Sequence, residues 1–189
     1  GPGDDAGLFK AKKELIFSTD TSVENIHFPK GLNAKKIAYR SCAVAASDIA
    51  ACGGALKWLA ISLCTSSKDE KWIEDFSKGI REFSDSYKVP IIGGDLTSGK
   101  EISISIGVCG EIKKKHFMRR SGAQENDNIY VTGDLGEAFI GLNLLKNKKK
   151  KLSSKEKIYL NRFLRPSIEI AFSQELSKLA NSCIDISDG

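Results

Sequence analysis

Hydrophobic and polar positions alternate with a period of two in one long stretch of the chain, residues 101–112, which reads EISISIGVCGEI. Such alternation is typical of a β-strand that buries one of its two faces. Three shorter apolar runs also predict strands: residues 14–19, 57–64 and 89–92. The first run ends at Asp20, and the last continues into Gly93-Gly94-Asp95.

Two longer stretches carry apolar residues at the 3.6-residue spacing of an amphipathic helix. Residues 33–52 begin with Asn33, which is a good N-cap, and end before Gly53-Gly54. This stretch is rich in Ala and Ser, so we expect another element to pack closely against it. Residues 70–86 carry larger apolar side chains on one stripe: Trp72, Ile73, Phe76, Ile80 and Phe83. The order β-α-β-α-β-β predicts a mixed α/β unit in which both helices cover one sheet.

The pattern changes after residue 112, where a basic stretch begins. Further elements are expected in this order: a strand at 128–132, helices at 137–146, 154–164 and 167–181, and a strand from Cys183. The last strand reaches Gly189, a residue that should start a turn. We therefore interpret this region as the beginning of a second domain that is not complete.

Together these patterns predict an α/β (α+β) fold in two parts. Residues 1–112 are expected to form an N-terminal domain with a mixed sheet and helices on one face. Residues 113–189 are expected to form the start of a truncated second α+β domain.

Composition limits the class of protein. Of the 189 residues, 41% are hydrophobic and 28% are charged, which is the balance of a soluble globular protein. No apolar run approaches the roughly 20 residues that cross a bilayer, so we expect no membrane partner. The five cysteines form no Cys-x-x-Cys pair. This favours free thiols in a reducing compartment, the cytoplasm, over a disulfide framework or a structural zinc site.

The net charge is +5, and much of it comes from a basic run at 113–120 and from lysines at 146–157. A basic excess suggests anionic partners. The lysine-rich run has no interleaved aromatic residues, however, so a solvated surface is favoured over a nucleic-acid platform. We expect no nucleic-acid partner.

Two nucleotide-binding patterns occur in the sequence, and neither has the required context. Residues 94–100 match Gly-x-x-x-x-Gly-Lys, but Glu101 follows in place of Ser or Thr, and the next element is a strand. A phosphate loop needs the hydroxyl and a helix N-terminus at this point. Residues 1–6 match a loose Gly-x-G-x-x-Ala pattern, but they are acidic and no strand precedes them. Both interpretations are rejected.

Acidic residues recur at the ends of predicted elements, among small or hydroxyl-bearing neighbours. They occur in Gly3-Asp4-Asp5-Ala6, Ser18-Thr19-Asp20-Thr21, Ala46-Ser47-Asp48-Ile49, Gly93-Gly94-Asp95 and Asp185-Ile186-Ser187-Asp188-Gly189. Carboxylates brought together repel one another unless cations hold them, and hard oxygen ligands suit Mg²⁺. Any single one could be an ordinary turn or cap aspartate. The series of five favours a metal cluster.

The chain resembles thiamine-monophosphate kinases of the AIR synthetase-like (PurM-like) superfamily. The matching segments, in chain order, are GDDAG at 3–7, STDTSVENIHF at 18–28, ASDIAACGG at 46–54, KWLAISL at 57–63, IIGGDLT at 91–97, RSGA at 120–123, VTGDLGEA at 131–138, RP at 165–166 and DISDG at 185–189. Each segment alone is weakly specific, whereas the ordered series is specific. It corresponds to the N-terminal two-thirds or so of such a kinase.

The resemblance implies a PurM-like fold and an enzyme that phosphorylates thiamine monophosphate with ATP, giving thiamine diphosphate by direct in-line transfer. It implies Mg²⁺ as cofactor, ATP as co-substrate and a homodimer in which N-terminal sheets combine. The implied metal-site residues are Asp4, Ser18, Thr19, Asp20, Asp48, Asp95, Asp185 and Asp188. The implied nucleotide contacts are Gly94, Asp95, Arg120 and Ser187, and the implied contact to the thiamine substrate is His27. No side chain is implied as a catalytic acid, base or nucleophile, because the acceptor phosphate oxygen is already ionised near neutral pH.

Other interpretations stay open at this point. Asp5 could take the place of Asp4, since spacing cannot separate neighbours. Another ATP-using member of the superfamily could share the aspartates: an aminoimidazole ribonucleotide synthetase, a selenophosphate synthetase or a hydrogenase-maturation protein. A non-catalytic module could instead use the basic loops to bind RNA or acidic proteins, although it would have no use for the carboxylates.

Overall fold

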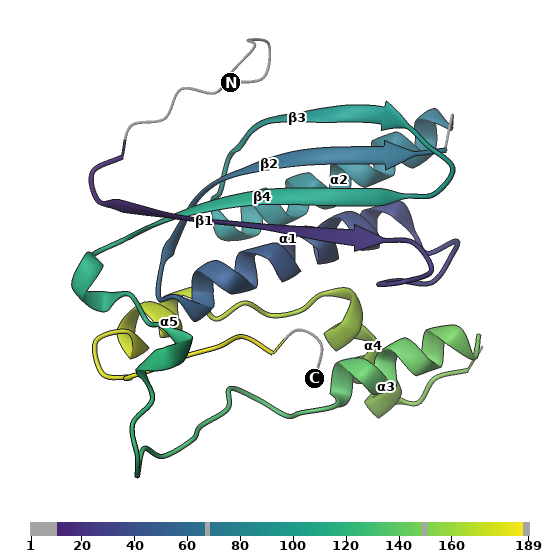
Figure 1. The fold of residues 1–189 in the computed structure, drawn as a ribbon. Coiled ribbons are helices and arrows are strands. Elements are labelled where there is room, and N and C mark those ends of the chain that lie inside the picture. The colour runs from purple at the N-terminus through teal and green to yellow at the C-terminus, as the bar shows by residue number, and fades with distance from the viewer. Residues whose placement is uncertain (1–10, 67–68, 149–150, 187–189) are drawn as a thin grey trace.

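The structure is a computed structural model that describes residues 11–66, 69–148 and 151–186. Its first half follows the element order expected from the sequence (Figure 1). The elements are β1 (Glu14–Val23), α1 (Ala34–Ala51), β2 (Ala55–Thr65), α2 (Glu70–Tyr87), β3 (Ile91–Ser98) and β4 (Ser103–Ile112). The predicted N-cap is confirmed, because Asn33 Oδ1 accepts a hydrogen bond from the backbone N–H of Lys36 at 3.2 Å.

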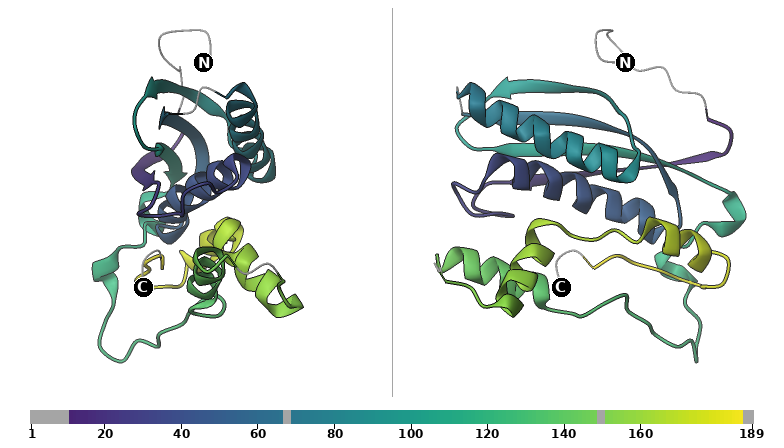
Figure 2. Two further views of the ribbon diagram at one scale, coloured as in Figure 1. Left: turned by 90° about the vertical axis from the view of Figure 1, so that its right-hand side faces the viewer. Right: turned by 180° about the vertical axis from the view of Figure 1, so that it is seen from behind.

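The four strands form one mixed sheet in the order β1-β4-β2-β3. β4 runs antiparallel to both β1 and β2, whereas β3 runs parallel to β2. β1 and β3 are therefore the two edges of the sheet. Both long helices lie on one face of it, as Figure 2 shows from behind. The expected mixed α/β arrangement is confirmed.

The core lies between the sheet and this helical layer. Ile104, Ile106 and Val108 of β4 point into it and are completely buried, which accounts for the period-two pattern of that strand. Phe83 of α2 is also completely buried. A Cβ atom at Gly79 would overlap the carbonyl oxygen of Lys35, so α2 approaches α1 more closely there than any other residue would allow.

The second half of the chain consists mainly of α3 (Glu137–Lys146), α4 (Ser154–Leu164) and α5 (Ile170–Leu176), preceded by two short 3-10 turns, η1 (Lys114–His116) and η2 (Arg120–Gly122). These helices lie below α1, on the side away from the sheet (Figures 1 and 2). Arg40 of α1 donates to the carbonyl oxygen of Phe163 at 2.6 Å and covers its ring at 4.0 Å. α1 is thus packed on both sides, as its Ala- and Ser-rich composition suggested.

Three expectations for the second half are wrong. Residues 128–132 form no strand but an exposed, irregular segment, and Ile129 in it is 99% exposed. No described strand lies beside this segment, and a strand needs a partner for its backbone N–H and C=O groups. The helix expected at 167–181 is reduced to α5. The strand expected from Cys183 is also absent over residues 183–186, and only an isolated parallel bridge joins Arg119 to Ser182.

Candidate functional site

Strand β1 and helix α1 meet at two of the predicted site residues. Ser18 Oγ donates a hydrogen bond to Asp48 Oδ2 at 2.6 Å, and both side chains are partly buried. Ser18 lies on the helix-facing side of β1, and Asp48 lies in the last turns of α1. The hydroxyl therefore fixes the direction of one carboxylate oxygen and leaves the other available to a ligand.

Asp185 lies close to the same point, although it is 137 positions later in the chain than Asp48. Burial and then the negative charge of Asp48 raise the pKa of the Asp185 carboxyl. A hydrogen bond with Ser47 and the positive charge of Arg120 oppose this rise. Two half-buried carboxylates and one exposed guanidinium thus lie together between β1, α1 and the C-terminal segment.

Backbone contacts bring that C-terminal segment to α1. The N–H of Met118 donates to the carbonyl oxygen of Cys52, just after α1, at 3.2 Å. One residue further on, Arg119 forms the bridge with Ser182, whose hydroxyl also donates to the carbonyl oxygens of Arg119 and Arg120 at 2.7 and 2.9 Å. The segment around η2 therefore links the end of α1 to residues 182–185.

Thr19 and Asp20 follow Ser18 on β1, and their side chains point to opposite faces because they are consecutive strand residues. Asp20 shares the helix-facing side with Ser18 and is half-buried. Thr19 is exposed on the other face of the sheet. Of these two predicted metal ligands, only Asp20 has its side chain on the face where Asp48 lies.

Gly94 and Asp95 lie on β3, at the opposite edge of the sheet from Asp20. In the register of the sheet, Asp20 lies across from Ile106, Ile106 from Ile61, and Ile61 from Gly94. Three interstrand spacings separate the two edges, roughly 14 Å. Within one chain, the exposed Asp95 therefore does not join Ser18, Asp48 and Asp185.

His27 is exposed in the turn that follows β1. Its Nδ1 accepts a hydrogen bond from the backbone N–H of Val23 at 3.0 Å. In the neutral imidazole the remaining hydrogen is then on Nε2, which makes that atom a donor. The neighbouring Phe28 is buried in the core and anchors the turn.

Asp4, Ser187 and Asp188 lie outside the described residues. Among residues 11–66, 69–148 and 151–186, no group of three His, Cys, Asp or Glu side chains is close enough to hold a metal ion by itself. Among the described residues, the junction brings together two carboxylates and a hydroxyl, and Asp20 lies on the same face of β1 as Ser18. All of these are hard oxygen donors that suit Mg²⁺.

Sequence reasoning did not identify Ser47 as a functional residue. Its hydrogen bond to Asp185 places it directly in the site. Ser47 and Asp48 are consecutive in a helix, so their side chains point about 100° apart, and each contacts a different segment of the chain. The local sequence around Ser47 does not predict its contact with Asp185, because that contact depends on how residues 182–186 return to α1.

Two cavities lie away from this junction. One of about 540 Å³ lies between the end of β3 and the start of α2, and its lining includes Leu96, Thr97, Ser98 and Ile73. The other, of about 370 Å³, lies between the N-terminal part of α1 and helix α4. In the described part of the chain, no helix is both long enough and apolar enough to span a membrane.

Comparison with known proteins identifies the fold family. Residues 3–112 match the family described as AIR synthase related protein, N-terminal domain. The chain belongs to this family. Its mixed sheet and two covering helices agree with the PurM-like fold.

Similar proteins and structures agree with this family. A thiamine-monophosphate kinase of Buchnera aphidicola subsp. Schizaphis graminum is 41% identical over all of this chain and 59% of its own length. The crystal structure of thiamine-monophosphate kinase from Stenotrophomonas maltophilia superposes with a TM-score of 0.92 at 32% identity, covering all of this chain and 62% of the other. AaThiL complexed with AMPPCP and TMP superposes with a TM-score of 0.89 at 33% identity, covering 99% and 60%. The chain therefore spans about three-fifths of the length of these relatives.

Proposed function

We propose that the protein containing this chain is a thiamine-monophosphate kinase, which transfers the γ-phosphoryl group of ATP to thiamine monophosphate and so forms thiamine diphosphate. The observation that carries this proposal is the meeting of Asp48, Asp185 and Arg120 beside Ser18. This arrangement combines metal-binding oxygens with a cation that suits phosphate. The relatives with this name, and the neighbour that binds AMPPCP and TMP, support the choice of nucleotide and acceptor.

The residues at this junction fit bound Mg²⁺. Burial and then the charge of Asp48 raise the pKa of the Asp185 carboxyl, and a divalent cation held by these carboxylates would relieve the repulsion between them. Ser18, Asp20, Asp48 and Asp185 would supply the described ligands, and we include Asp4 and Asp188 as further candidates. When bound, Mg²⁺ neutralises charge on the transferring phosphoryl group.

The side chains of this chain then act by positioning and by charge. Arg120 is exposed beside the carboxylates and would hold a phosphate oxygen of the nucleotide, together with Ser187. His27 would donate from Nε2 to the phosphate of the thiamine substrate, because its Nδ1 is already occupied by the Val23 N–H. The acceptor oxygen is ionised near neutral pH, so no general base is needed, and phosphoryl transfer depends mainly on positioning and electrostatics.

A homodimer would explain how predicted site residues on opposite edges of the sheet could act in one site. Asp20 and Asp95 lie on opposite edges of one chain, so they could serve one nucleotide only if a second copy brought its own β3 edge across. The face of the sheet away from the helices exposes Phe17, which is 63% exposed and contacts the Trp58 ring at 5.9 Å between centroids. Burial against another surface would remove this exposed aromatic ring from water. Thr19 lies on this same face.

The cavity beside β3 has a size and place that suit the nucleoside of ATP. Its volume of about 540 Å³ lies within the usual range for ligand pockets. It begins one residue beyond Asp95, so a nucleotide bound there would have Gly94 and Asp95 beside its phosphates. We further propose that the protein acts in the cytoplasm, consistent with five cysteines that are all free thiols.

The direct test is a chromatographic assay with the full-length protein, ATP, Mg²⁺ and thiamine monophosphate. We expect thiamine diphosphate to form, to disappear with a chelator, and to fall at least a hundredfold in Asp48→Asn. The matched control is Asp85→Asn, which changes an exposed aspartate on α2 and should keep full activity. Binding of Mg-ATP without product would contradict the thiamine acceptor and favour another ATP-using enzyme of the superfamily. Salt-sensitive RNA binding without any ATP binding would instead favour the non-catalytic module.

A further inference from the structure

The cavity of about 370 Å³ between α1 and α4 has no part in the function proposed above. Its lining includes Lys36 in the first turn of α1, and Asp48 lies 12 residues further along the same helix. At 1.5 Å per residue this is roughly 18 Å. The cavity is therefore separate from the junction of Ser18, Asp48 and Asp185.

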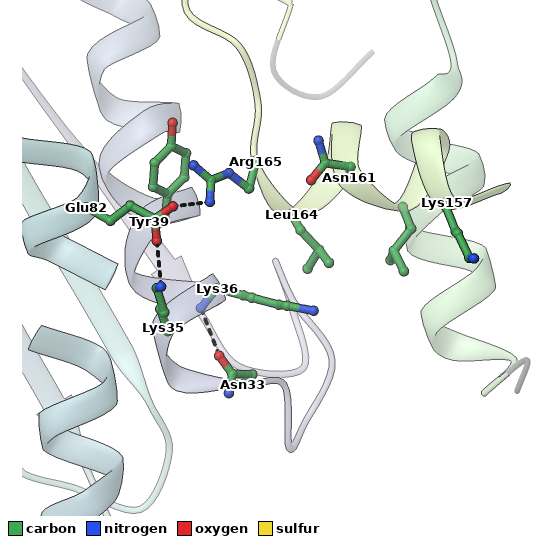
Figure 3. Close-up of a pocket in the computed structure, with 10 residues that line it drawn as sticks. Asn33, Lys35, Lys36, Tyr39, Glu82, Lys157, Asn161, Leu164 and Arg165 are labelled. Atoms are coloured by element: carbon green, nitrogen blue, oxygen red, sulfur yellow. Dashed lines mark hydrogen bonds and ion pairs between the residues drawn. The ribbon is translucent and has the colours of Figure 1, made fainter. Parts of the chain in front are cut away.

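The lining of this cavity is strongly positive. It contains four cationic side chains, Lys35, Lys36, Lys157 and Arg165, and one carboxylate, Glu82, which leaves a net charge of 4 − 1 = +3. Glu82 pairs with Lys35 at 3.0 Å and also with Arg165 (Figure 3). Hydrogen bonds from Lys35 and Arg165 hold the pKa of Glu82 below its usual value, so the carboxylate stays ionised and committed to these two partners.

Lys36 and Lys157 are the two cations that Glu82 does not neutralise. They come from different elements, α1 and α4, and among the described residues their ammonium groups form no ion pair or hydrogen bond. Figure 3 shows the Lys36 side chain extending from α1 toward the α4 side of the cavity. Two ammonium groups that line one cavity from different elements are suited to an anion with two negative charges.

Part of the remaining lining is apolar, beside the polar side chains of Asn33 and Asn161. Leu164 is buried at the end of α4, and the Tyr39 ring, also buried, lies under the Arg165 guanidinium at 4.4 Å. These walls would face a non-polar part of a ligand. The volume lies at the lower end of the range for small-molecule pockets and exceeds the need of a simple inorganic ion.

We propose that the cavity between α1 and α4 is a binding site for a small organic phosphate monoester, with Lys36 and Lys157 holding the phosphate and with Leu164 and Tyr39 contacting the organic part. The site is independent of Mg²⁺ and of the proposed kinase reaction. It gives the protein a second place where a phosphorylated metabolite can bind.

The experiment is calorimetric titration of the full-length protein with phenyl phosphate, at low ionic strength and with a chelator present. We expect saturable binding that is weakened at least tenfold in the double variant Lys36→Ala/Lys157→Ala. Both lysines are exposed, so the variant should fold, which circular dichroism checks. The matched control is Lys71→Ala, which removes an exposed lysine from α2 outside the cavity and should leave the affinity unchanged.

Two further titrations distinguish binding at this cavity from binding at the proposed metal site. Asp48→Asn should retain phenyl phosphate binding, because it acts only on the junction with Asp185. Inorganic phosphate should bind at least fivefold more weakly than phenyl phosphate, because it cannot contact the apolar walls. Equal affinity in the wild type and the double lysine variant would overturn the proposal. So would loss of binding in Asp48→Asn, or equal binding of inorganic phosphate.

Discussion

Similar apolar runs adopt different structures in the two halves of the molecule. The first half is the sheet and its helices, residues 11–112, and the second half is residues 113–186. In the first, Ile104 and Ile106 are completely buried between the sheet and its helices. In the second, Ile129 is 99% exposed and Tyr130 is 86% exposed, although the run that contains them is as apolar as a strand. An apolar run thus becomes a strand only where a neighbouring strand is available to pair with it.

The candidate site lies where these two halves meet. Asp48 and Ser47 belong to α1, which is packed on both sides. Asp185 and Arg120 belong to irregular segments that a few backbone contacts hold in place. One half thus supplies candidate ligands on a well-packed helix, and the other supplies candidate groups whose position depends on a smaller number of contacts. Changes in the two halves should therefore have different consequences.

The largest expected effect comes from truncating a large core side chain in the first half. Phe83→Ala should lower the free energy of unfolding by about 3–5 kcal/mol, because it removes a completely buried ring that contacts Tyr39 and Tyr87. Phe139→Ala in the second half is the matched control, since this ring is 67% exposed, and it should cost less than about 1 kcal/mol. Denaturant titration measures both. Equal losses of unfolding free energy in the two variants would contradict the proposed difference in packing between the halves.

The next effect concerns the junction itself. Ser47→Ala should weaken Mg²⁺ binding by about tenfold, because Asp185 loses the hydroxyl that orients it. Ser41→Ala is a suitable control on the same helix, since the Ser41 hydroxyl is buried without a hydrogen-bond partner among the described residues. It should leave metal affinity unchanged and should not lower stability. Titration calorimetry with Mg²⁺ checks both variants, and an unchanged affinity in Ser47→Ala would show that Ser47 does not position Asp185.

A smaller loss of stability is expected from removing Arg165, which links the second half to the first. Arg165 pairs with Glu82 of α2 and covers the Tyr39 ring of α1. Because the ion pair is partly exposed, Arg165→Ala should cost only about 1–2 kcal/mol. Arg162→Ala, which breaks only the exposed pair with Glu137, should cost less than about 1 kcal/mol. Thermal unfolding of the two variants would contradict this ranking if Arg162→Ala proved the more damaging.

The smallest effect is a pH dependence from the same contact. The folded-state pKa of Glu82 is lowered from 4.5, mainly by its hydrogen bond with Lys35. The stabilisation is therefore present above the unfolded pKa and is lost as the pH falls through the lower folded value. Glu82→Gln should be less stable than the wild type at neutral pH, and the difference should shrink as the medium is acidified below pH 4.5. Unfolding curves over that acid range would contradict the assignment if the difference stayed constant.

Much of the sheet half could be predicted from sequence because its signals are local. Each of these signals reflects the structure of its own segment. Examples are the period-two pattern of β4, the Asn33 cap and the small residues of α1. In the second half, the apolar pattern at 128–132 was misleading, because pairing depends on a distant partner. The candidate site shows the same limit. The motifs single out Asp48 and Asp185 as candidates, but the hydrogen bond between Ser47 and Asp185 depends on the return of the chain to α1.

We propose that Asp48 of the first half and Asp185 of the second hold one metal site. The most direct measurement is electron paramagnetic resonance titration of the full-length protein with Mn²⁺, which substitutes for Mg²⁺, in the presence of AMPPCP. We expect Asp48→Asn and Asp185→Asn each to weaken Mn²⁺ binding at least tenfold, while the surface control Asp85→Asn binds like the wild type. Wild-type affinity in both site variants would contradict the claim.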